Sequence, residues 1–484
     1  MNTLWDGSAL PASPRLEEHL IADVAVVGGG MAGILTAFAL HRNGLRVVLL
    51  EEDRLAGGVT ADTTARISAQ HGLFCRRLTD DFGTHLARQY LMAQLHAVKQ
   101  YRDLVTQLGI DCDFAVQDSF VFAAPNGPDL EPERLAALRL GAPVRLCAVD
   151  GLPFPVREAL CFENQARLSP LKFLAALLPG LTVYEHSPVR DIRAHLVRCD
   201  GGTVEASHIV ITSHFPMLEG RGHYHLRVRQ EQTYLLALSG APRLDGWYLD
   251  ADTRGWSLQQ CGETLILSGG THRCGTGSGD GFERLRAQAK LWFPASSEVG
   301  AWSAQDCVTL DGVPYIGAYS SAAPYLHVAT GFGRWGMTNS MVSATLLTAD
   351  ILGRNYPYAD VFSPARFFPS ASIEAMMEGA LYAMRGRRRL HTAAELAARD
   401  IAPGHGGIVQ HHGRQIGLYR REDGALFAVE PVCPHRKRAL VWNDEEKTWD
   451  CPCHGSRFDY QGHRLYHPAK AALRTIDGLN AQEI

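Results

Sequence analysis

Near the start of the chain, the spacing of apolar residues predicts a strand, a helix and a second strand. Residues 21–27 (IADVAVV) are mostly apolar, and the stretch that follows is apolar with the 3.6-residue period of a helix. The helix is expected to end at Asn43-Gly44, because Asn and Gly accept the left-handed backbone of a helix end. A second apolar run, residues 46–50 (RVVLL), follows at once. Together these segments predict a βαβ unit.

Three glycines separate the first strand from the helix. Gly28, Gly30 and Gly33 have the spacing G-x-G-x-x-G. The first allows a tight turn, the second lets the backbone approach a pyrophosphate, and the third lets helix and strand pack closely. The helix N-terminus then presents free N–H groups and a positive dipole end to the phosphates. This predicts a site for an adenine dinucleotide, either NAD or FAD, with Met31 and Ala32 in its wall.

An acidic residue ends the second strand of this unit. Glu51 stands where a carboxylate can accept hydrogen bonds from the ribose hydroxyls of the dinucleotide. Glu52 and Asp53 are the next choices for this role. Strand, glycines, helix and acid are in register with one another, which distinguishes the segment from an accidental glycine-rich turn.

Two short Cys/His pairs stand close to the other end of the chain. The first is Cys433 with His435, and the second is Cys451 with His454. Zinc can use two cysteines and two histidines, but zinc modules seldom split these ligands into one Cys/His pair per loop. A Rieske centre does so, because two thiolates hold one iron and two imidazoles hold the other. We therefore predict a [2Fe-2S] cluster with these four ligands.

The segment around the second pair, WDCPCHGSRFDYQG, resembles the Rieske ferredoxin domain, and the resemblance covers about 395 to 484. The sequence departs from the high-potential form of that domain at two positions. Arg438 stands where that form has a disulfide-bonded cysteine, so Cys453 has no partner there, and Phe458 replaces a tyrosine that donates to a ligand sulfur. Ser456 is left as a possible donor to a sulfide. Fewer hydrogen bonds to sulfur lower the reduction potential.

Three further segments identify the dinucleotide. ADTTARISAQHG (residues 61–72), DGVPYIG (311–317) and VATGFGRWGMTNSMVSATLLTADILG (328–353) resemble the D-amino-acid-oxidase-like FAD oxidoreductases, over about 20 to 355. The resemblance implies FAD, with the second glycine segment opening a helix against the flavin. It places these residues along the flavin: Thr63, Thr64, Ala65, Arg66, Gly331, Gly333, Gly336 and Met337.

The same resemblance suggests which side chains lie near the flavin ring, namely His71, Tyr234, His272, Arg334 and Trp335. Arg334 is the best candidate to hold a substrate carboxylate or the anionic edge of the flavin, because a guanidinium binds planar anions through two hydrogen bonds. Tyr234 and Trp335 are also typical of an aromatic wall, and His272 can serve its own loop instead of a substrate.

The pattern and the two resemblances predict an α/β fold (α+β overall) in three parts. These are a Rossmann-like FAD-binding domain, an inserted sheet-based substrate domain, and a small all-β C-terminal Rieske domain. We expect the FAD-binding domain in residues 20–85, 150–215 and 300–355, the substrate domain in 86–149 and 216–299, a packed connector in 356–394 and the Rieske domain in 395–484.

Composition and charge remove several classes of function. Of the 484 residues, 46% are hydrophobic and 20% charged, with a net charge of -4. We expect no nucleic-acid or membrane partner, because both favour a concentrated basic face and the run from Arg385 (RGRRRL) is short. Apolar stretches stay below the ~18 residues of a membrane span. Without the pattern of a secretory signal, the protein is expected in the cytoplasm, where its eleven cysteines serve as thiols or metal ligands.

These predictions combine into a hypothesis of function. The protein is expected to oxidise a C–N bond of a small-molecule amine or amino acid by hydride transfer to FAD, and to relay electrons through the cluster to a protein or small-molecule acceptor. Two alternatives stay open: an electron-transfer protein that serves a partner enzyme, and an oxygen-using amine oxidase with a structural cluster. A Rieske oxygenase is not expected, because it needs a second iron in a large domain after the cluster.

Overall fold

A parallel sheet carries the first predicted unit. The computed structural model describes residues 4–5, 10–218, 222–277, 279–389 and 400–476. The sheet has the order β16-β17-β10-β1-β2-β7, with β8 and β9 as a hairpin beside β10. Its strands are β1 (His19–Val27), β2 (Val47–Leu50), β7 (Thr182–Tyr184), β8 (Val189–Arg193), β9 (Leu196–Cys199), β10 (Thr203–Ile211), β16 (Tyr315–Ala318) and β17 (Leu326–Thr330).

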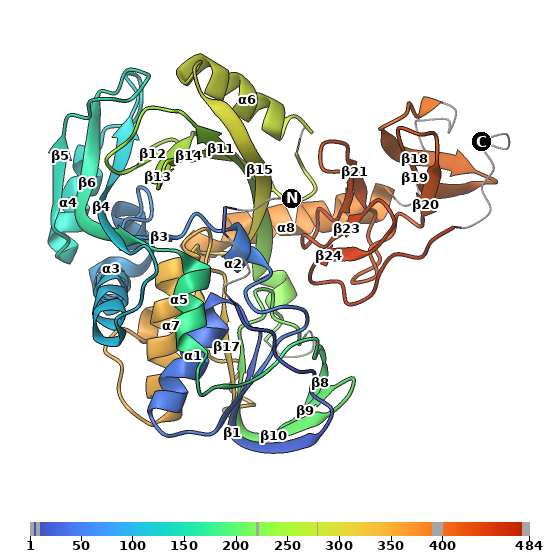
Figure 1. The fold of residues 1–484 in the computed structure, drawn as a ribbon, viewed down its shortest axis with the longest axis horizontal. Coiled ribbons are helices and arrows are strands. Elements are labelled where there is room, and N and C mark those ends of the chain that lie inside the picture. Colours follow the sequence, from blue (N-terminus) through green and yellow to red (C-terminus); the bar gives the residue numbers. More distant parts are fainter. Residues whose placement is uncertain (1–3, 6–9, 219–221, 278, 390–399, 477–484) are drawn as a thin grey trace.

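Helices α1 (Met31–Arg42), α5 (Pro170–Leu177) and α7 (Gly336–Ile351) lie together beside this sheet (Figure 1). The predicted βαβ unit is confirmed: β1 pairs in parallel with β2, and α1 joins them. Strand β1 has β2 on one side and β10 on the other, both parallel to it, so the strand order reverses at β1 and the carboxyl ends of these strands open at one crevice. Nucleotides bind at such switch points of parallel sheets.

A second, mostly antiparallel sheet stands over the first. Its order is β15-β11-β14-β13-β12-β4-β6-β3, and β5 pairs with β6. Its strands are β3 (Arg66–Ile67), β4 (Ala115–Ala123), β5 (Val144–Cys147), β6 (Glu158–Arg167), β11 (Val228–Ser239), β12 (Trp247–Asp250), β13 (Ser257–Cys261), β14 (Thr264–Arg273) and β15 (Ser297–Thr309). Helices α4 (Glu131–Leu140) and α6 (Gly281–Trp292) accompany this sheet, and the one-turn helix α2 (Val59–Asp62) lies beside β15.

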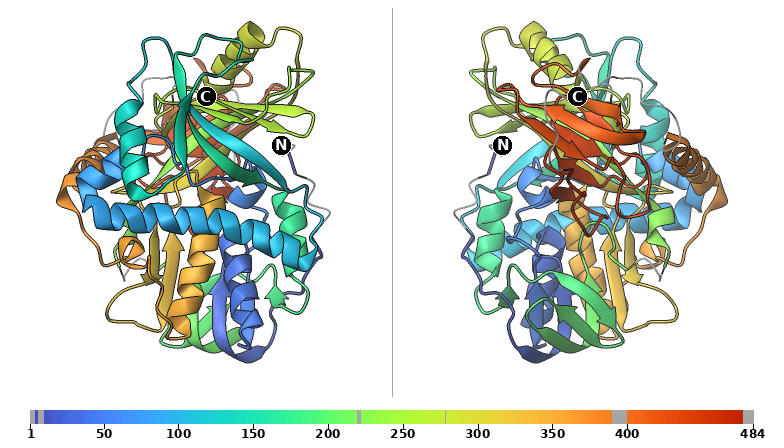
Figure 2. Two further views of the ribbon diagram at one scale, coloured as in Figure 1. Left: turned by 90° about the vertical axis from the view of Figure 1, so that its left-hand side faces the viewer. Right: turned by 90° about the vertical axis from the view of Figure 1, so that its right-hand side faces the viewer.

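The boundaries between these two parts differ from the predicted ones. Strands β3, β6 and β15 belong to the second sheet, although residues 66–67, 158–167 and 300–309 were assigned to the FAD-binding domain. Helix α3 (Cys75–Leu108) is kinked at Gly83 (φ +78°), close to the predicted boundary at residue 85, and its long portion after the kink crosses the molecule (Figure 2). Strand pairing is decided by partners far along the chain, which local hydrophobic pattern does not reveal.

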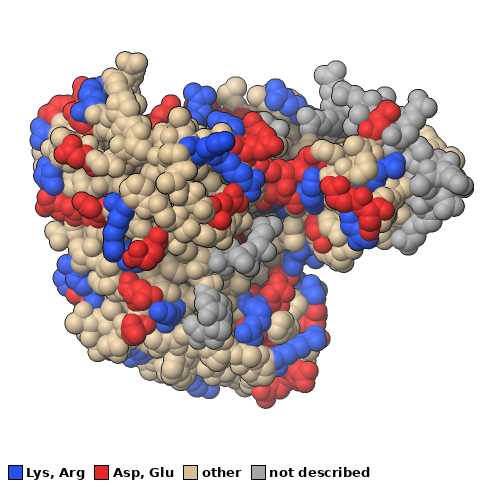
Figure 3. Space-filling model, turned by 45° about the horizontal axis from the view of Figure 1, so that its top comes forward, with Lys and Arg blue, Asp and Glu red and all other residues tan. Residues whose placement is uncertain are grey.

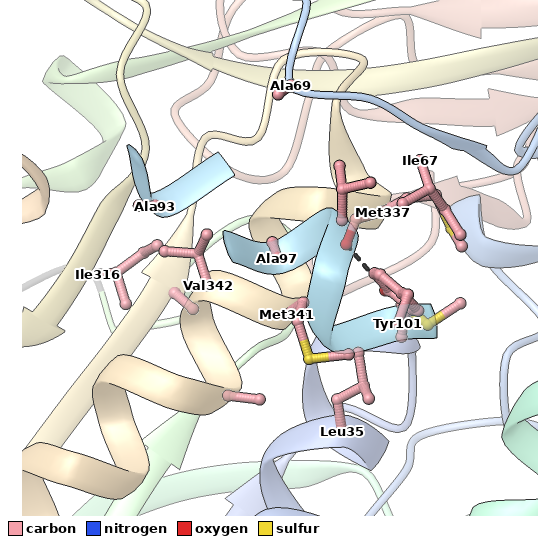
Figure 4. Close-up of a cluster of buried hydrophobic side chains, with 14 of the residues drawn as sticks. Leu35, Ile67, Ala69, Ala93, Ala97, Tyr101, Ile316, Met337, Met341 and Val342 are labelled. Atoms are coloured by element: carbon pink, nitrogen blue, oxygen red, sulfur yellow. Dashed lines mark hydrogen bonds between the residues drawn. The ribbon is translucent and has the colours of Figure 1, made fainter. Parts of the chain in front are cut away.

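The core of the molecule fixes the helix that follows the second glycine segment. Leu35 of α1, Ala97 and Tyr101 of α3, and Met341 of α7 are buried side by side (Figure 4). The Tyr101 hydroxyl also donates a hydrogen bond of 2.9 Å to the backbone carbonyl of Met337. Helix α7 therefore begins at a position set by two other helices, with its N-terminus directed at the crevice of the first sheet.

The C-terminal part is all β. It contains a three-stranded sheet and a four-stranded sheet, and stands beside the second sheet near β15 (Figure 1). Its strands are β18 (Gly406–His411), β19 (Arg414–Arg420), β20 (Leu426–Val429), β21 (Val441–Asn443), β22 (Thr448–Asp450), β23 (Arg457–Asp459) and β24 (Arg464–Tyr466). The connector holds helix α8 (Pro369–Arg389), and short 3-10 turns occupy Tyr224–Leu226 and Asp360–Phe362.

Surface charge and hydropathy of the described residues agree with a globular chain. Acidic and basic side chains are interspersed on the face in Figure 3 and do not gather by sign. No helix in the described part of the chain is long and apolar enough to cross a membrane.

Candidate functional site: a dinucleotide cavity and a cluster-binding tip

A cavity of about 1340 Å³ lies between the first sheet, the second sheet and the C-terminal part. It exceeds the roughly 300–1,000 Å³ of common ligand pockets, so it has room for a large cofactor together with a substrate. Of the residues predicted at the dinucleotide, the following line it: Gly28, Gly30, Met31, Ala32, Glu51, Glu52, Thr63, Thr64, Arg66, Gly331, Gly333, Gly336 and Met337. Gly33 and Ala65 lie behind the wall.

The first glycine turn has the geometry that a nucleotide site needs. A Cβ on Gly33 would lie 1.8 Å from the Gly28 carbonyl oxygen, so this glycine lets α1 approach β1. A Cβ on Gly30 would meet only the Thr60 hydroxyl, at 3.2 Å, and would otherwise point into the cavity. The two glycines thus differ in role: one closes the helix–strand contact, and the other leaves space for the ligand.

The two acids that follow β2, Glu51 and Glu52, bind different partners. Glu51 accepts hydrogen bonds from the backbone N–H groups of Gly29 (2.6 Å) and Asp53 (2.9 Å), and burial raises its pKa. It stays fixed at the glycine turn, in the wall of the cavity. Glu52, in contrast, is bound by Arg464 and by His467 (2.8 Å), which belong to the C-terminal part. Despite partial burial, these two partners lower the pKa of Glu52 to about 2.

Two positions beside the predicted flavin locus have a left-handed backbone without being glycine. Ala65 has φ +58° and Arg334 has φ +68°. Such conformations cost about 1–2 kcal/mol and persist where surrounding structure imposes them, commonly at functional sites. The Arg334 backbone N–H is held by the Asp306 carboxylate, and its Nη1 donates to the Thr271 hydroxyl at 3.3 Å. Arg334 is thereby directed at the cavity.

The five predicted ring neighbours occupy different environments. His71, His272, Arg334 and Trp335 line the cavity, whereas Tyr234 does not. Tyr234 is buried against Phe282 and stacks on His272 at a ring distance of 5.6 Å, so it supports that histidine from behind. The placement of Tyr234 at the ring is therefore corrected: its strand position turns its side chain to the opposite face of the sheet.

His71 is held on all sides. Its ring stacks on Trp335 at 4.4 Å, Nδ1 shares a hydrogen bond with the Tyr90 hydroxyl (2.7 Å), and Nε2 lies 2.9 Å from the Ser68 carbonyl oxygen. Burial lowers its pKa to about 3, so it is neutral at physiological pH. These contacts make His71 a support for Trp335 and not a proton carrier.

Sequence reasoning missed the cavity residues of the second sheet. Arg229, Glu231 and Thr233 of β11 and Ala304 and Asp306 of β15 line the cavity. They alternate along their strands with residues that face away, which is the period-two pattern of a strand covered on both faces. That alternation is visible in RVRQEQT (227–233) and was the signal available.

The two cluster-binding loops of the C-terminal part have the same backbone design. In the first, the Cys433 N–H donates to Arg438 O (2.8 Å); in the second, the Cys451 N–H donates to Ser456 O (2.8 Å). The first loop connects β20 with β21, and the second connects β22 with β23. Each carries one predicted cysteine and one predicted histidine.

The four predicted ligands pair by type, which is the arrangement a [2Fe-2S] cluster requires. The thiols of Cys433 and Cys451 are hydrogen-bonded to each other, and the rings of His435 and His454 lie 4.8 Å apart, nearly perpendicular. The residues therefore fit two irons, with two ligands on each.

Two further observations support the fit of these residues to a [2Fe-2S] cluster. Nδ1 of His454 is buried and has no hydrogen-bond partner among the described residues, a costly state that metal ligation explains. The Ser456 side chain is hydrogen-bonded to the Cys433 thiol, so the predicted donor does stand beside a ligand sulfur. Cys453 is free, in agreement with Arg438 occupying the place of its partner.

Only one sheet separates the cavity from the cluster-binding loops. On β11, Glu231 faces the cavity, while Gln230 faces away and donates to the carbonyl oxygens of His454 and His467, both at 2.7 Å. On β15, Gln305 likewise faces away and donates to Gly455 O at 2.5 Å. Both glutamines are almost fully buried. The second cluster loop thus rests directly on the back of the cavity wall.

Other contacts fix the same interface. Arg273 at the end of β14 donates to Pro452 O (3.0 Å) and Cys453 O (2.8 Å). The Glu445 carboxylate of the β21–β22 turn accepts the first backbone N–H groups of α6, at Gly281 (2.9 Å) and Phe282 (2.6 Å). A helix N-terminus favours such a carboxylate. The C-terminal part is therefore docked on the second sheet by side-chain and backbone hydrogen bonds.

Known proteins share both sites. Residues 23–350 match the family of FAD dependent oxidoreductases (DAO), and residues 392–477 match the Rieske [2Fe-2S] domain. The chain is 35% identical to YhfW of Bacillus subtilis (strain 168), which is named as a Rieske 2Fe-2S iron-sulfur protein, over 98% of this chain and 97% of that one. It is 26% identical to the glycine oxidase of Geobacillus kaustophilus (strain HTA426), over 73% of this chain and 99% of that one.

Solved structures share the fold of the larger part. The crystal structure of glycine oxidase from Geobacillus kaustophilus has a TM-score of 0.62 at 22% identity and covers 72% of this chain and 100% of that one. The L-amino acid deaminase of Proteus vulgaris has a TM-score of 0.60 at 18% identity, over 74% and 99%. With the fitting cavity and ligand set, these matches show that the chain belongs to the FAD dependent oxidoreductase family and carries a Rieske [2Fe-2S] domain at its C-terminal end.

Proposed function

We propose that the protein oxidises the C–N bond of an amino acid or amine and passes the electrons singly through the Rieske cluster to a protein or small-molecule acceptor. FAD supplies the acceptor of a hydride, and the cluster supplies a carrier of single electrons. One observation carries the proposal: the cavity and the cluster-binding loop lie on opposite faces of the same two strands.

The relay is supported by a short bonded route through that wall. The Gly333 N–H, on the cavity side, donates to Cys307 O at 2.9 Å. Two residues earlier on β15, Gln305 donates to Gly455 O, next to the ligand His454. Every link of this route is a covalent bond or a hydrogen bond within the protein. A domain that served stability alone would not need its ligand loop at this place.

The substrate is proposed to carry a carboxylate. Arg66 and Arg334 both line the cavity, and the pKa of Arg66 is lowered to about 10, first by burial and then by the charge of Arg334. Two guanidinium groups that repel each other are stabilised by an anion between them. Nε of Arg66 is buried without a hydrogen-bond partner among the described residues, so it has a donor to offer.

Relatives agree with a nitrogen-bearing substrate. The chain matches a glycine oxidase, and it is 24% identical to the gamma-glutamylputrescine oxidoreductase of Escherichia coli (strain K12), over 77% of this chain and 94% of that one. A protein that only transferred electrons would need no open space over the flavin, and the large cavity favours an enzyme. Besides the two proposed cluster ligands, nine cysteines form no disulfide, which supports the reducing cytoplasm as its location.

The relay is tested by anaerobic single turnover with a panel of amino acids and amines. The right substrate should bleach the flavin first and reduce the cluster second, and His454→Ala should abolish the second step while leaving the first nearly unchanged. The physical reason is that substrate oxidation needs only the cavity, whereas reoxidation needs the cluster. A cluster that stays oxidised for many turnover times after the flavin has bleached would reject the relay in favour of a structural cluster and direct reaction of the flavin with oxygen.

The carboxylate assignment is tested with matched substrates. Arg334→Met should raise the Kd of the amino acid by about 100-fold, as expected for loss of a charge-assisted bidentate pair worth about 3 kcal/mol. It should change the Kd of the corresponding amine, which lacks the carboxylate, by less than about threefold. Equal loss for both compounds would show that Arg334 holds the flavin or the loop and not the substrate.

A further inference from the structure

We propose that the Rieske domain completes the FAD site: its segment 464–470 closes the nucleotide end of the cavity and is held shut by Arg464 and His467 on Glu52. This goes beyond the reaction, because it concerns how the cofactor is retained and needs no assumption about the substrate. It makes the second domain part of the cofactor-binding site of the first.

The position of Glu52 is the first observation. It follows Glu51, the acid at the end of β2, and lines the same end of the cavity. Its two carboxylate oxygens are each occupied from the C-terminal part: Oε1 by Arg464 Nη2, and Oε2 by His467 Nε2 at 2.8 Å. All three side chains are partly buried, with exposed fractions of 28% for Glu52, 18% for Arg464 and 37% for His467.

The lining of the cavity is the second observation. Residues of this segment form part of its wall, namely Arg464, Leu465, Tyr466, His467, Pro468 and Lys470. They come from β24 and the turn after it, more than 400 positions from Glu52 in sequence. A segment that merely packed on the outside of the FAD domain would not reach the interior of the cavity.

Two further hydrogen bonds hold the segment in place. The Tyr466 hydroxyl donates to Asp62 Oδ2 at 3.1 Å, directly before the flavin-lining residues Thr63 and Thr64. The Gln230 side chain donates to His467 O at 2.7 Å. The segment is thus bound at three points outside the Rieske domain: after β2, at the end of α2, and at β11 of the second sheet.

The consequence is a coupling between cofactor retention and domain docking. A dinucleotide below this segment cannot leave before the Glu52 contacts open, so the contacts add to the barrier for its release. By reciprocity, bound FAD and the closed segment stabilise each other wherever they touch. Lys470, which also lines the cavity, adds a positive charge beside a site for a ligand that carries a pyrophosphate.

The test measures FAD release from the full-length holoprotein. FAD fluorescence after dilution into an excess of a flavin-scavenging apoprotein gives the dissociation rate, and cluster absorbance in the same sample reports an intact Rieske domain. Arg464→Ala should release FAD about tenfold faster, and Tyr466→Phe should also accelerate release. Arg474→Ala is the matched control, because Arg474 pairs with Glu430 in the same domain but is 78% exposed and does not line the cavity.

A double-mutant cycle separates the contact from a general loss of packing. If Arg464 acts through Glu52, Arg464→Ala should change the release rate by less than about twofold in a Glu52→Gln background. Unchanged release in both Arg464→Ala and Tyr466→Phe, with the cluster intact, would overturn the proposal. So would a full tenfold effect of Arg464→Ala in the Glu52→Gln background. Should Arg464→Ala lose its cluster, Tyr466→Phe decides alone, since it removes only one hydroxyl.

Discussion

At the residue scale, the glycines of the first turn separate folding from binding. A side chain on Gly33 collides with the Gly28 backbone at 1.8 Å, whereas one on Gly30 enters the cavity. We expect Gly33→Ala to lower the stability of the whole domain by several kcal/mol, since the contact is backbone and cannot move aside. Gly30→Leu should keep the fold and lose FAD, because its side chain fills the path of the pyrophosphate.

Thermal unfolding and flavin content of the purified variants check this difference. Gly30→Ala is the control, since its methyl group meets only the Thr60 hydroxyl at 3.2 Å and should retain most of the FAD. If Gly30→Leu unfolded at the same reduced temperature as Gly33→Ala, the assignment of separate roles would fail.

Also at this scale, Asp306 should make stability depend on pH. Burial raises its pKa to about 6, against 3.8 for an ordinary aspartate, although Arg334 acts in the opposite direction. The folded protein therefore holds this proton more tightly than the unfolded chain, so stability falls as pH rises from about 4 to about 6 and stays lower above. Asp306→Asn should remove this loss, which corresponds to about 2–3 kcal/mol at pH 7.5.

Unfolding free energies of the wild type and Asp306→Asn at pH 4, 5, 6 and 7.5 check the sign. Glu298→Gln, on the same strand, is the control with the opposite behaviour. Arg286 lowers the pKa of Glu298, so the charged carboxylate stabilises the fold at pH values above the ordinary glutamate pKa, and that stability is lost as the pH falls. An Asp306→Asn difference that did not grow between pH 4 and 6 would contradict the prediction.

At the element scale, the turn after β14 determines the position of the second cluster-binding loop. Gly275, in this turn, has φ +73°, and a Cβ there would lie 2.7 Å from Pro452 N. Gly262, in the turn before β14, has φ +58° and open space around it. Alanine at either position costs about 1–2 kcal/mol for the left-handed backbone. Only Gly275→Ala should displace the cluster loop and slow cluster reduction by the flavin, by about tenfold or more.

The comparison uses the electron paramagnetic resonance spectrum of the reduced cluster and the rate of its reduction in single turnover. Gly262→Ala should match the wild type in both. The idea that β14 seats the loop would be refuted by a Gly275→Ala protein with an unchanged spectrum and rate.

At the scale of the whole molecule, removal of the cluster should leave FAD bound, although the two cofactor sites share one wall. Iron and acid-labile sulfide should each approach two per chain, with zinc far below one, because the ligands pair two by two. His454→Ala should erase the cluster spectrum and retain FAD, since none of the four cluster ligands lines the cavity. His463→Ala is the matched control, because His463 is exposed and pairs only with Asp459.

Stoichiometric zinc in protein made with adequate iron would reject the cluster assignment. Loss of FAD from His454→Ala as fast as from Arg464→Ala would contradict the expected retention and would show that removal of the cluster opens the segment 464–470. Retention at the wild-type rate would show that the segment stays closed without the cluster.

The sequence alone determined the parts whose chemistry is local. Gly28, Gly30 and Gly33 act within one turn, and the pairs Cys433–His435 and Cys451–His454 each lie within one short loop, so the spacing within each motif is fixed by the local chain. It also determined the order of β1, α1 and β2, because hydrophobic periodicity reports which side of each element is buried.

Only the tertiary structure decided the rest. The sequence could not assign β3, β6 and β15 to the second sheet, show that Tyr234 faces away from the cavity, or bring Glu52 to Arg464, because these depend on pairings between distant segments. A strand's residues alternate between two faces, and which face meets the cofactor is set by the neighbour that covers the other. Here that neighbour is the Rieske domain, and its docking on β11 and β15 turns one sheet into the wall that both sites share.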